Sequence, residues 1–214
     1  MRFVTPVALA LALALTGGVV AAPAMAAKEK KQAGPKLNVS PEVIKALQAA
    51  QAAMEKQDFA TAKASLAEAD GLSKSNDDKY QVGAIKLNLS ITSKDSALQG
   101  EALAQMLDSG LTPAANLAQF NEVAANGALQ AKNYDLAIQR GQAALQAGAK
   151  PESVQTTIAQ AYFGKAGTGN AAVEPARGFN QQGLAALKAA ADAQKASGQP
   201  VPAQWYQIGV GRAA

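Results

Sequence analysis

Helix-opening signals recur along this chain at a nearly constant interval, and this repetition constrains the fold more than any other feature. The openings at Pro41, Asp77, Pro113, Pro151 and Pro200 follow one another at intervals of 36, 36, 38 and 49 residues. Each interval reads as helix, turn and helix, and no run of alternating β-branched residues predicts a strand. A unit of this size cannot bury its apolar face alone, so the units are expected to stack on one another.

The clearest unit runs from Phe120 to Pro151, with a tight turn predicted at residues 131–133. Its second helix is expected to carry a stripe of small residues that lets the two helices of the unit approach closely. The stripe consists of Ala137, Gly141, Ala144 and Gly148.

Two of the helix openings carry specific capping predictions. Ser40 is expected to cap the helix that begins at Pro41, and Asp77-Asp78 to cap the helix that follows them. The last interval is longer than the others because residues 167–178 form an insertion before a long Ala-rich helix at 180–197.

Several units share residues at matching spacings. These are Trp205, Ile208 and Gly209 in a W-x2-L-G arrangement, Ile158, Ala159 and Tyr162 in another first helix, and two second-helix sets, Phe59 with Ala62 and Ala69, and Tyr134 with Ala137 and Ala144. With these residues the chain resembles the tetratricopeptide repeat family. The resemblance implies an all-α, right-handed α-solenoid of about four helix–turn–helix pairs plus a C-terminal helix over residues 40–214. A generic Ala-rich helical bundle is the alternative.

The N-terminal residues have the composition of an export signal. Residues 1–26 combine a basic start, an Ala/Leu-rich apolar stretch and an A-x-A site at Ala24–Ala26, which together predict a cleaved signal peptide. Residues 27–39 are expected to form a flexible basic linker. The protein is therefore expected to be exported, to a bacterial periplasm or beyond, with no membrane span after signal removal.

The charge of the chain argues against a nucleic-acid partner. Lys and Arg number 20 and Asp and Glu number 16, but from Leu37 onward the two classes balance at 15 each. A nucleic-acid interface would need a concentrated positive surface instead.

The chain has few of the residues that enzymes use for catalysis. It contains neither Cys nor His, the usual thiolate nucleophile and the commonest general base and metal ligand. The glycine-rich stretch 164–169 lacks the order of a phosphate-binding loop. We therefore expect no enzymatic activity, no cofactor and no metal.

The resemblance implies a concave surface lined by the first helix of each pair, with neutral amides suited to the backbone of an extended peptide. The expected groove residues are Gln51, Gln81, Asn88, Gln119, Asn126, Gln160 and Tyr206. The predicted function is a scaffold that binds a protein or peptide in the cell envelope. Two alternatives stay open: self-association through the C-terminal helix, and small-molecule or glycan binding under the 167–178 insertion.

Overall fold

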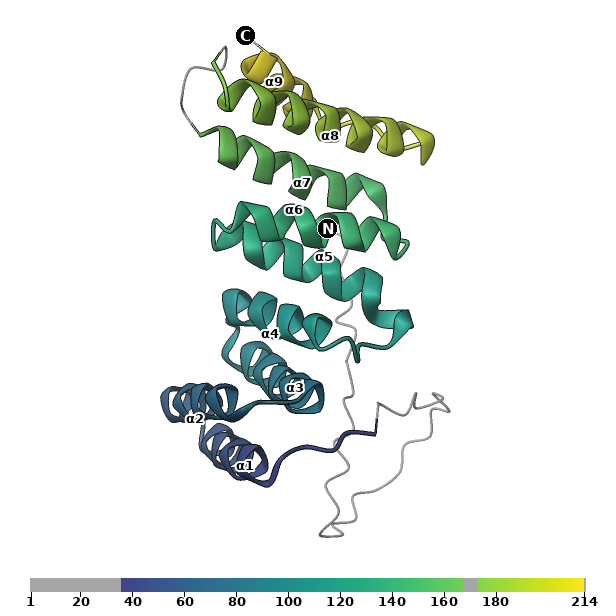
Figure 1. The fold of residues 1–214 in the computed structure, drawn as a ribbon. Helices are drawn as coiled ribbons and strands as arrows, with labels where there is room; N and C mark the ends of the chain where they lie inside the picture. The colour runs from purple at the N-terminus through teal and green to yellow at the C-terminus, as the bar shows by residue number, and fades with distance from the viewer. Residues whose placement is uncertain (1–35, 168–172, 214) are drawn as a thin grey trace. The chain divides into compact units, whose positions relative to one another are not determined.

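A computed structural model describes residues 36–167 and 173–213 of the chain. Within these residues every regular element is an α-helix, which confirms the all-α prediction (Figure 1). The helices are α1 (Pro41–Glu55), α2 (Phe59–Leu72), α3 (Asn76–Ser93), α4 (Ser96–Asp108), α5 (Ala114–Gln130), α6 (Tyr134–Gln146), α7 (Pro151–Ala166), α8 (Ala176–Ala196) and α9 (Ala203–Ala213).

The helices all belong to one compact unit that begins at Leu37. The predicted signal peptide, residues 1–26, lies outside the described residues. Residues 27–35 of the predicted linker also lie outside the described residues. Leu37 and Val39, at its end, pack against buried clusters of the helical unit.

The same kind of turn joins the two helices within each of the first three pairs, α1–α2, α3–α4 and α5–α6. A residue with positive φ, at Gln57, Lys94 and Lys132 in turn, follows the first helix of the pair. The next residue is Asp or Asn, and its side chain accepts a hydrogen bond from the backbone N–H three residues later. Asp and Asn suit this position because their short polar side chains satisfy a free amide of the first turn. This turn includes the one predicted at residues 131–133.

A different connection follows the second, third and fourth pairs, whereas residues 73–75 join α2 to α3 without a left-handed glycine. Gly110, Gly148 and Gly198 lie just beyond α4, α6 and α8 and have φ values of 73°, 90° and 72°. Glycine ends helices in this left-handed conformation because it has no Cβ to clash. A proline follows two or three residues later in each case. From α3 to α7 the two connections therefore alternate at the repeat interval of the sequence.

Both capping predictions need correction. Ser40 precedes α1, but its side chain forms no cap and donates instead to Asp78. The cap of α3 is Ser75, two residues earlier than expected, and its hydroxyl accepts from the backbone N–H of Asp78 in a capping box. Asp77 and Asp78 thus lie inside the first turn of α3, where carboxylates complement the helix dipole.

Each helix packs mainly against its neighbours in the chain, as the ordered succession from α1 to α9 in Figure 1 illustrates. A close backbone approach joins α4 to α5, where a Cβ built on Gly127 would lie 2.6 Å from the Cα of Gly100. No side chain larger than hydrogen fits between these two backbones. The α4–α5 contact therefore requires glycine on both helices.

The predicted small-residue stripe on α6 serves a different neighbour from the one expected. Gly141 faces α7, where a Cβ would lie 2.6 Å from Cγ1 of Ile158. Gly148 lies beyond the end of α6 and belongs to the connection described above. The predicted stripe was therefore wrong for Gly141, which packs on α7, and for Gly148, which lies outside α6.

Candidate functional site

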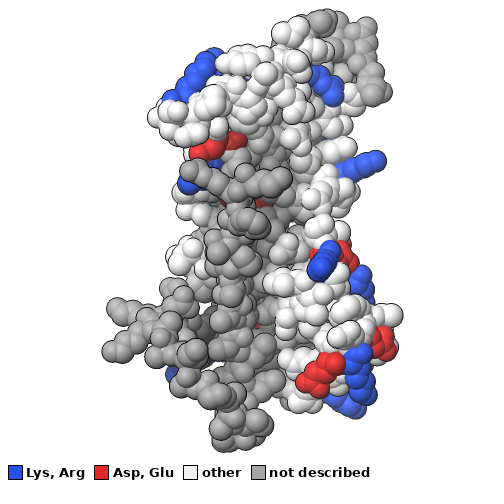
Figure 2. Space-filling view, turned by 180° about the vertical axis from the view of Figure 1, so that it is seen from behind, with Lys and Arg blue, Asp and Glu red and all other residues white. Residues whose placement is uncertain are grey.

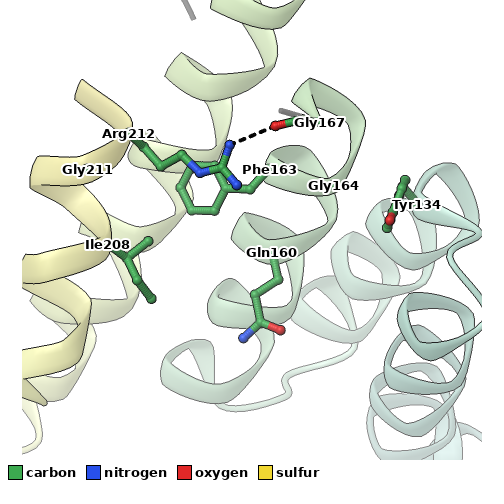
Figure 3. A pocket seen from close by; sticks show the side chains of 8 residues that line it. All are labelled: Tyr134, Gln160, Phe163, Gly164, Gly167, Ile208, Gly211 and Arg212. Atoms are coloured by element: carbon green, nitrogen blue, oxygen red, sulfur yellow. Dashed lines mark hydrogen bonds between the residues drawn. The ribbon is translucent and has the colours of Figure 1, made fainter. Parts of the chain in front are cut away.

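A hollow of about 600 Å³ lies between α6, α7 and α9 (Figure 3). Its wall combines an aromatic and aliphatic part with a few polar groups, which is the composition expected of a binding site. The lining residues are Tyr134, Gln160, Phe163, Gly164, Gly167, Ile208, Gly211 and Arg212.

Arg212 supplies the positive charge of this hollow. Its guanidinium group lies 5.1 Å from the centre of the Phe163 ring, and its Nη1 donates to the carbonyl of Gly167 over 3.1 Å (Figure 3). Among the described residues no carboxylate forms an ion pair with it. The cation–π contact and the hydrogen bond hold the group in place while leaving other N–H donors free.

The opposite wall of the hollow depends on a close helix contact. The ring of Tyr134 lies directly on Gly164, where a Cβ would come within 2.4 Å of Cε1. Lys165, the next residue, pairs with Asp135 of α6 and lies 4.5 Å from the centre of the Phe179 ring of α8. These contacts fix α6, α7 and α8 relative to one another, so the wall of the hollow is held from several sides.

The structure places the seven predicted groove residues at several separate points. Gln160 lines the hollow, and Asn126 accepts a hydrogen bond of 2.7 Å from the Thr157 hydroxyl, between α5 and α7. The remaining five do not line the hollow. Gln51 and Gln81 are half-buried, and Asn88, Gln119 and Tyr206 are exposed.

The surface formed by the first helices is interrupted, which explains this separation. The backbones of α1 and α3 approach each other, as do those of α5 and α7, but within the described part of the chain α3 and α5 do not. The predicted residues on α3 therefore lie apart from those on α5. Sequence reasoning also missed Arg212, Phe163 and Tyr134 as residues of the hollow. The available signal was Arg212 itself, which lies three residues after Gly209, where the W-x2-L-G-x2-Y pattern of tetratricopeptide repeats has an aromatic residue.

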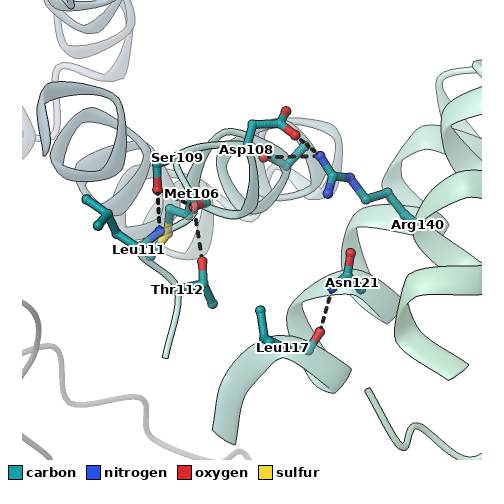
Figure 4. A network of polar contacts seen from close by, with 9 residues as sticks. Met106, Asp108, Ser109, Leu111, Thr112, Leu117, Asn121 and Arg140 are labelled. Atoms are coloured by element: carbon teal, nitrogen blue, oxygen red, sulfur yellow. Dashed lines mark hydrogen bonds and ion pairs between the residues drawn. The ribbon is translucent and has the colours of Figure 1, made fainter. Parts of the chain in front are cut away.

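A second hollow, of about 460 Å³, lies over α2, α3, α4 and the start of α6. Asp70, one of its residues, pairs with Lys86 and accepts from Gln105 over 2.7 Å. Asp108 pairs with the largely buried Arg140, which also donates to the carbonyl of Ala104 (Figure 4). Two of the four charged residues that line this hollow, Asp70 and Asp108, are thus engaged in ion pairs between helices, which is a role in helix packing.

Many polar contacts between helices join residues roughly one unit apart. Thr157 donates to Asn126, Ser153 to Glu122, and Ser96 to Gln130, at separations of 31, 31 and 34 residues. Lys63 and Asp95 pair at a separation of 32, and the bond from Lys63 together with the amide of Leu98 lowers the pKa of Asp95. Contacts at a constant separation are what stacked equivalent units produce.

The remaining surface is mixed in charge. Figure 2 shows Lys and Arg side chains interspersed with Asp and Glu on the visible face, without a broad area of one sign. No group of three or more potential metal ligands occurs among the described residues. None of their helices has the length and apolar character needed to cross a membrane.

Comparisons with family models, with curated proteins and with solved structures find no match to this chain. The resemblance to tetratricopeptide repeats therefore rests on the residues quoted above and stays a prediction.

Proposed function

We propose that this chain is an exported, tetratricopeptide-like right-handed α-solenoid that binds a protein or peptide partner in the cell envelope. The repeated turns, the left-handed glycines between pairs and the polar contacts one unit apart support the repeat architecture. The predicted signal peptide supports export.

The observation that carries the binding proposal is the hollow between α6, α7 and α9. Arg212 lines this hollow together with the exposed amide of Gln160. Among the described residues Arg212 has no carboxylate partner. Phe163, Ile208 and Tyr134 supply the apolar wall. An amide can bond to a peptide backbone, an apolar wall can take a side chain, and a guanidinium favours an acidic group. The partner is therefore a peptide segment that presents an acidic and an apolar residue together.

Site-specific photocrosslinking in the producing cells tests this proposal. A photoreactive amino acid replaces Gln160 in one variant and Gln182, an exposed residue of α8, in the control. A partner trapped from position 160, absent from position 182 and lost when Arg212→Glu is added supports the hollow as the binding site. The same products from both positions would contradict it.

A second candidate function is self-association through α9. Tyr206 and Val210 are 55% and 73% exposed there and lie one helical turn apart. If this surface joins two copies, the mass measured by sedimentation should rise with concentration and Val210→Glu should abolish the rise. A concentration-independent monomer mass would exclude this function.

A further inference from the structure

The chain enters α1 through a short extended segment, Leu37–Ser40, drawn as the purple coil that leads into α1 in Figure 1. Its side chains alternate. Leu37 packs against the buried cluster shared by α3, α4 and α5, and Val39 against the cluster shared by α1, α2 and α3. We call Leu37–Ser40 the N-terminal strap.

The backbone of the strap is bound by two carboxylates at the start of α3. The N–H of Asn38 donates to Oδ2 of Asp77 over 2.8 Å, and the N–H of Ser40 donates to Oδ1 of Asp78 over 2.8 Å. The Ser40 hydroxyl also contacts both oxygens of Asp78, at 2.8 and 2.7 Å. The backbone amides of Asn38 and Ser40 thus bind carboxylates, and the side chains of Leu37 and Val39 pack against apolar clusters. This alternation is the pattern of extended-peptide recognition.

Asp78 is also bound by residues outside the strap. It is fully buried, and the backbone N–H groups of Lys74 and Ser75 donate to its Oδ2 over 3.2 and 3.1 Å. Burial raises the pKa of Asp78, but the bonds from Ser40 and Ser75 outweigh burial and hold the pKa well below its usual range. A charged acceptor therefore stays fixed at the point where the strap presents its donors.

The apolar part of the site coincides with the interruption between α3 and α5. These two helices do not approach each other directly, yet Tyr80 of α3 and Phe120 of α5 belong to the cluster against which Leu37 packs. A side chain from outside the helices thus packs against a cluster to which α3 and α5 both contribute. The same surface is available to any extended segment with an apolar residue at that position.

We propose that the start of α3 is a binding site for an extended peptide with the pattern apolar, polar, apolar, hydroxyl, and that the chain's own N-terminal strap occupies it. A partner peptide of this pattern competes with the strap for Asp77, Asp78 and the Leu37 position. The site is separate from the hollow between α6, α7 and α9, so the inference does not rest on the proposed function.

Because the strap occupies the site, it competes with any free peptide and lowers the apparent affinity of that peptide. A tethered segment acts at an effective concentration of the order of millimolar, so a free peptide of the same sequence binds the unmodified chain weakly. Weakening the strap should expose the site. Because Asp77 contacts only a backbone amide of the strap in the described residues, Asp77→Asn weakens the site without changing the apolar positions.

The test uses the full chain and a fluorescent synthetic peptide of residues 36–40. Fluorescence anisotropy should show at least tenfold tighter binding to Leu37→Asp/Val39→Asp than to the unmodified chain. Adding Asp77→Asn should reduce that binding several-fold, whereas adding Arg212→Glu should leave it unchanged. A control peptide with Asp in place of its Leu should not bind. Equal binding by both peptides, or no difference between the variant and the unmodified chain, would overturn the proposal.

A second measurement covers the case in which the double variant does not fold. In the unmodified chain, excess peptide should displace the strap and accelerate hydrogen exchange at the amides of Asn38 and Ser40, while the control peptide should not. Unchanged exchange at both amides in millimolar peptide would equally overturn the proposal.

Discussion

α3 and α9 each open a unit of the sequence repeat, yet they are buried to opposite extents. α3 has fully buried side chains such as Val82, Ile85 and Leu89, and the N-terminal strap is bound at its start. In α9 no described side chain is buried to that degree, and Val210 is 73% exposed. α3 has helices before and after it and α9 packs on α8, so neighbours, more than sequence pattern, decide how strongly each helix is held.

Glycine shows the difference most directly. A Cβ on Gly83 of α3 would lie 2.7 Å from Cγ of Met106 and 3.0 Å from the carbonyl oxygen of Ala102. A Cβ on Gly209 of α9 would meet no atom within 4 Å. Glycine is thus required for packing at position 83 of α3, whereas at position 209 of α9 it only adds to the conformational entropy lost on folding. Substitutions at four positions test this comparison.

The largest effect is expected from Asp78→Ala in α3. The substitution removes a fully buried carboxylate and leaves the part-buried donors of Ser40, Lys74 and Ser75 without their acceptor, which should lower the free energy of unfolding by about 4 kcal/mol. Chemical denaturation of the variant and the unmodified chain measures the loss. Asp192→Asn, at an exposed carboxylate on α8, is the control and should change the free energy by less than about 0.5 kcal/mol.

The same carboxylate predicts a pH dependence. Its folded-state pKa is depressed, so its stabilisation is complete above the unfolded value of about 3.9 and is lost as the pH falls toward the folded value. Asp78→Asn should flatten the loss of stability between about pH 4 and pH 2. An unchanged acid profile in Asp78→Asn would show that other carboxylates cause the acid unfolding.

The next largest effect is expected from Gly83→Val. Its methyl groups would meet the backbone of Ala102 as well as the flexible Met106 side chain, so α3 and α4 must separate at a cost of about 2–3 kcal/mol. Thermal unfolding measures this change. Gly71→Ala on α2 is the matched control, because a Cβ there meets no atom within 4 Å and should stabilise the helix slightly. Equal destabilisation by both changes would contradict the packing argument.

The repeat order of the helices could be predicted from the sequence because the signals for starts and ends are local. The turn at residues 131–133 and the openings at Pro41 and Pro151 depend on residues next to one another in the chain. These local signals repeat in each unit, so their interval was visible without any knowledge of packing.

The groove could not be predicted because it depends on contacts between units. The expected set assumed that every first helix adjoins the next, but α3 and α5 do not approach each other, and the close glycine contact joins α4 to α5 instead. Likewise, the role of Arg212 depends on the distant Phe163 and Gly167. The hydroxyl of Ser40 bonds to a buried carboxylate 38 residues away, so a local capping rule misassigned it.

Trp205→Ala should produce a smaller and more local effect in α9. Trp205 packs against the cluster formed by α6, α7 and α8, and its removal should make α9 open more readily by about 2 kcal/mol. Hydrogen exchange at the α9 amides should therefore accelerate, while exchange in α3 stays unchanged. Tyr206→Ala removes the neighbouring exposed ring and should leave both rates nearly as they are.

The smallest effect, and one of opposite sign, is expected from Gly209→Ala. Because the new methyl group meets no atom, the change only removes the backbone entropy cost of glycine and should stabilise α9 by about 0.5–1 kcal/mol. Slower hydrogen exchange in α9 would measure this gain. The same substitution at Gly183 of α8 should destabilise, since a Cβ there lies 2.4 Å from Cε1 of Phe163. If Gly209→Ala also destabilised the protein, another surface would have to lie against α9, and self-association through this helix would become the explanation to test.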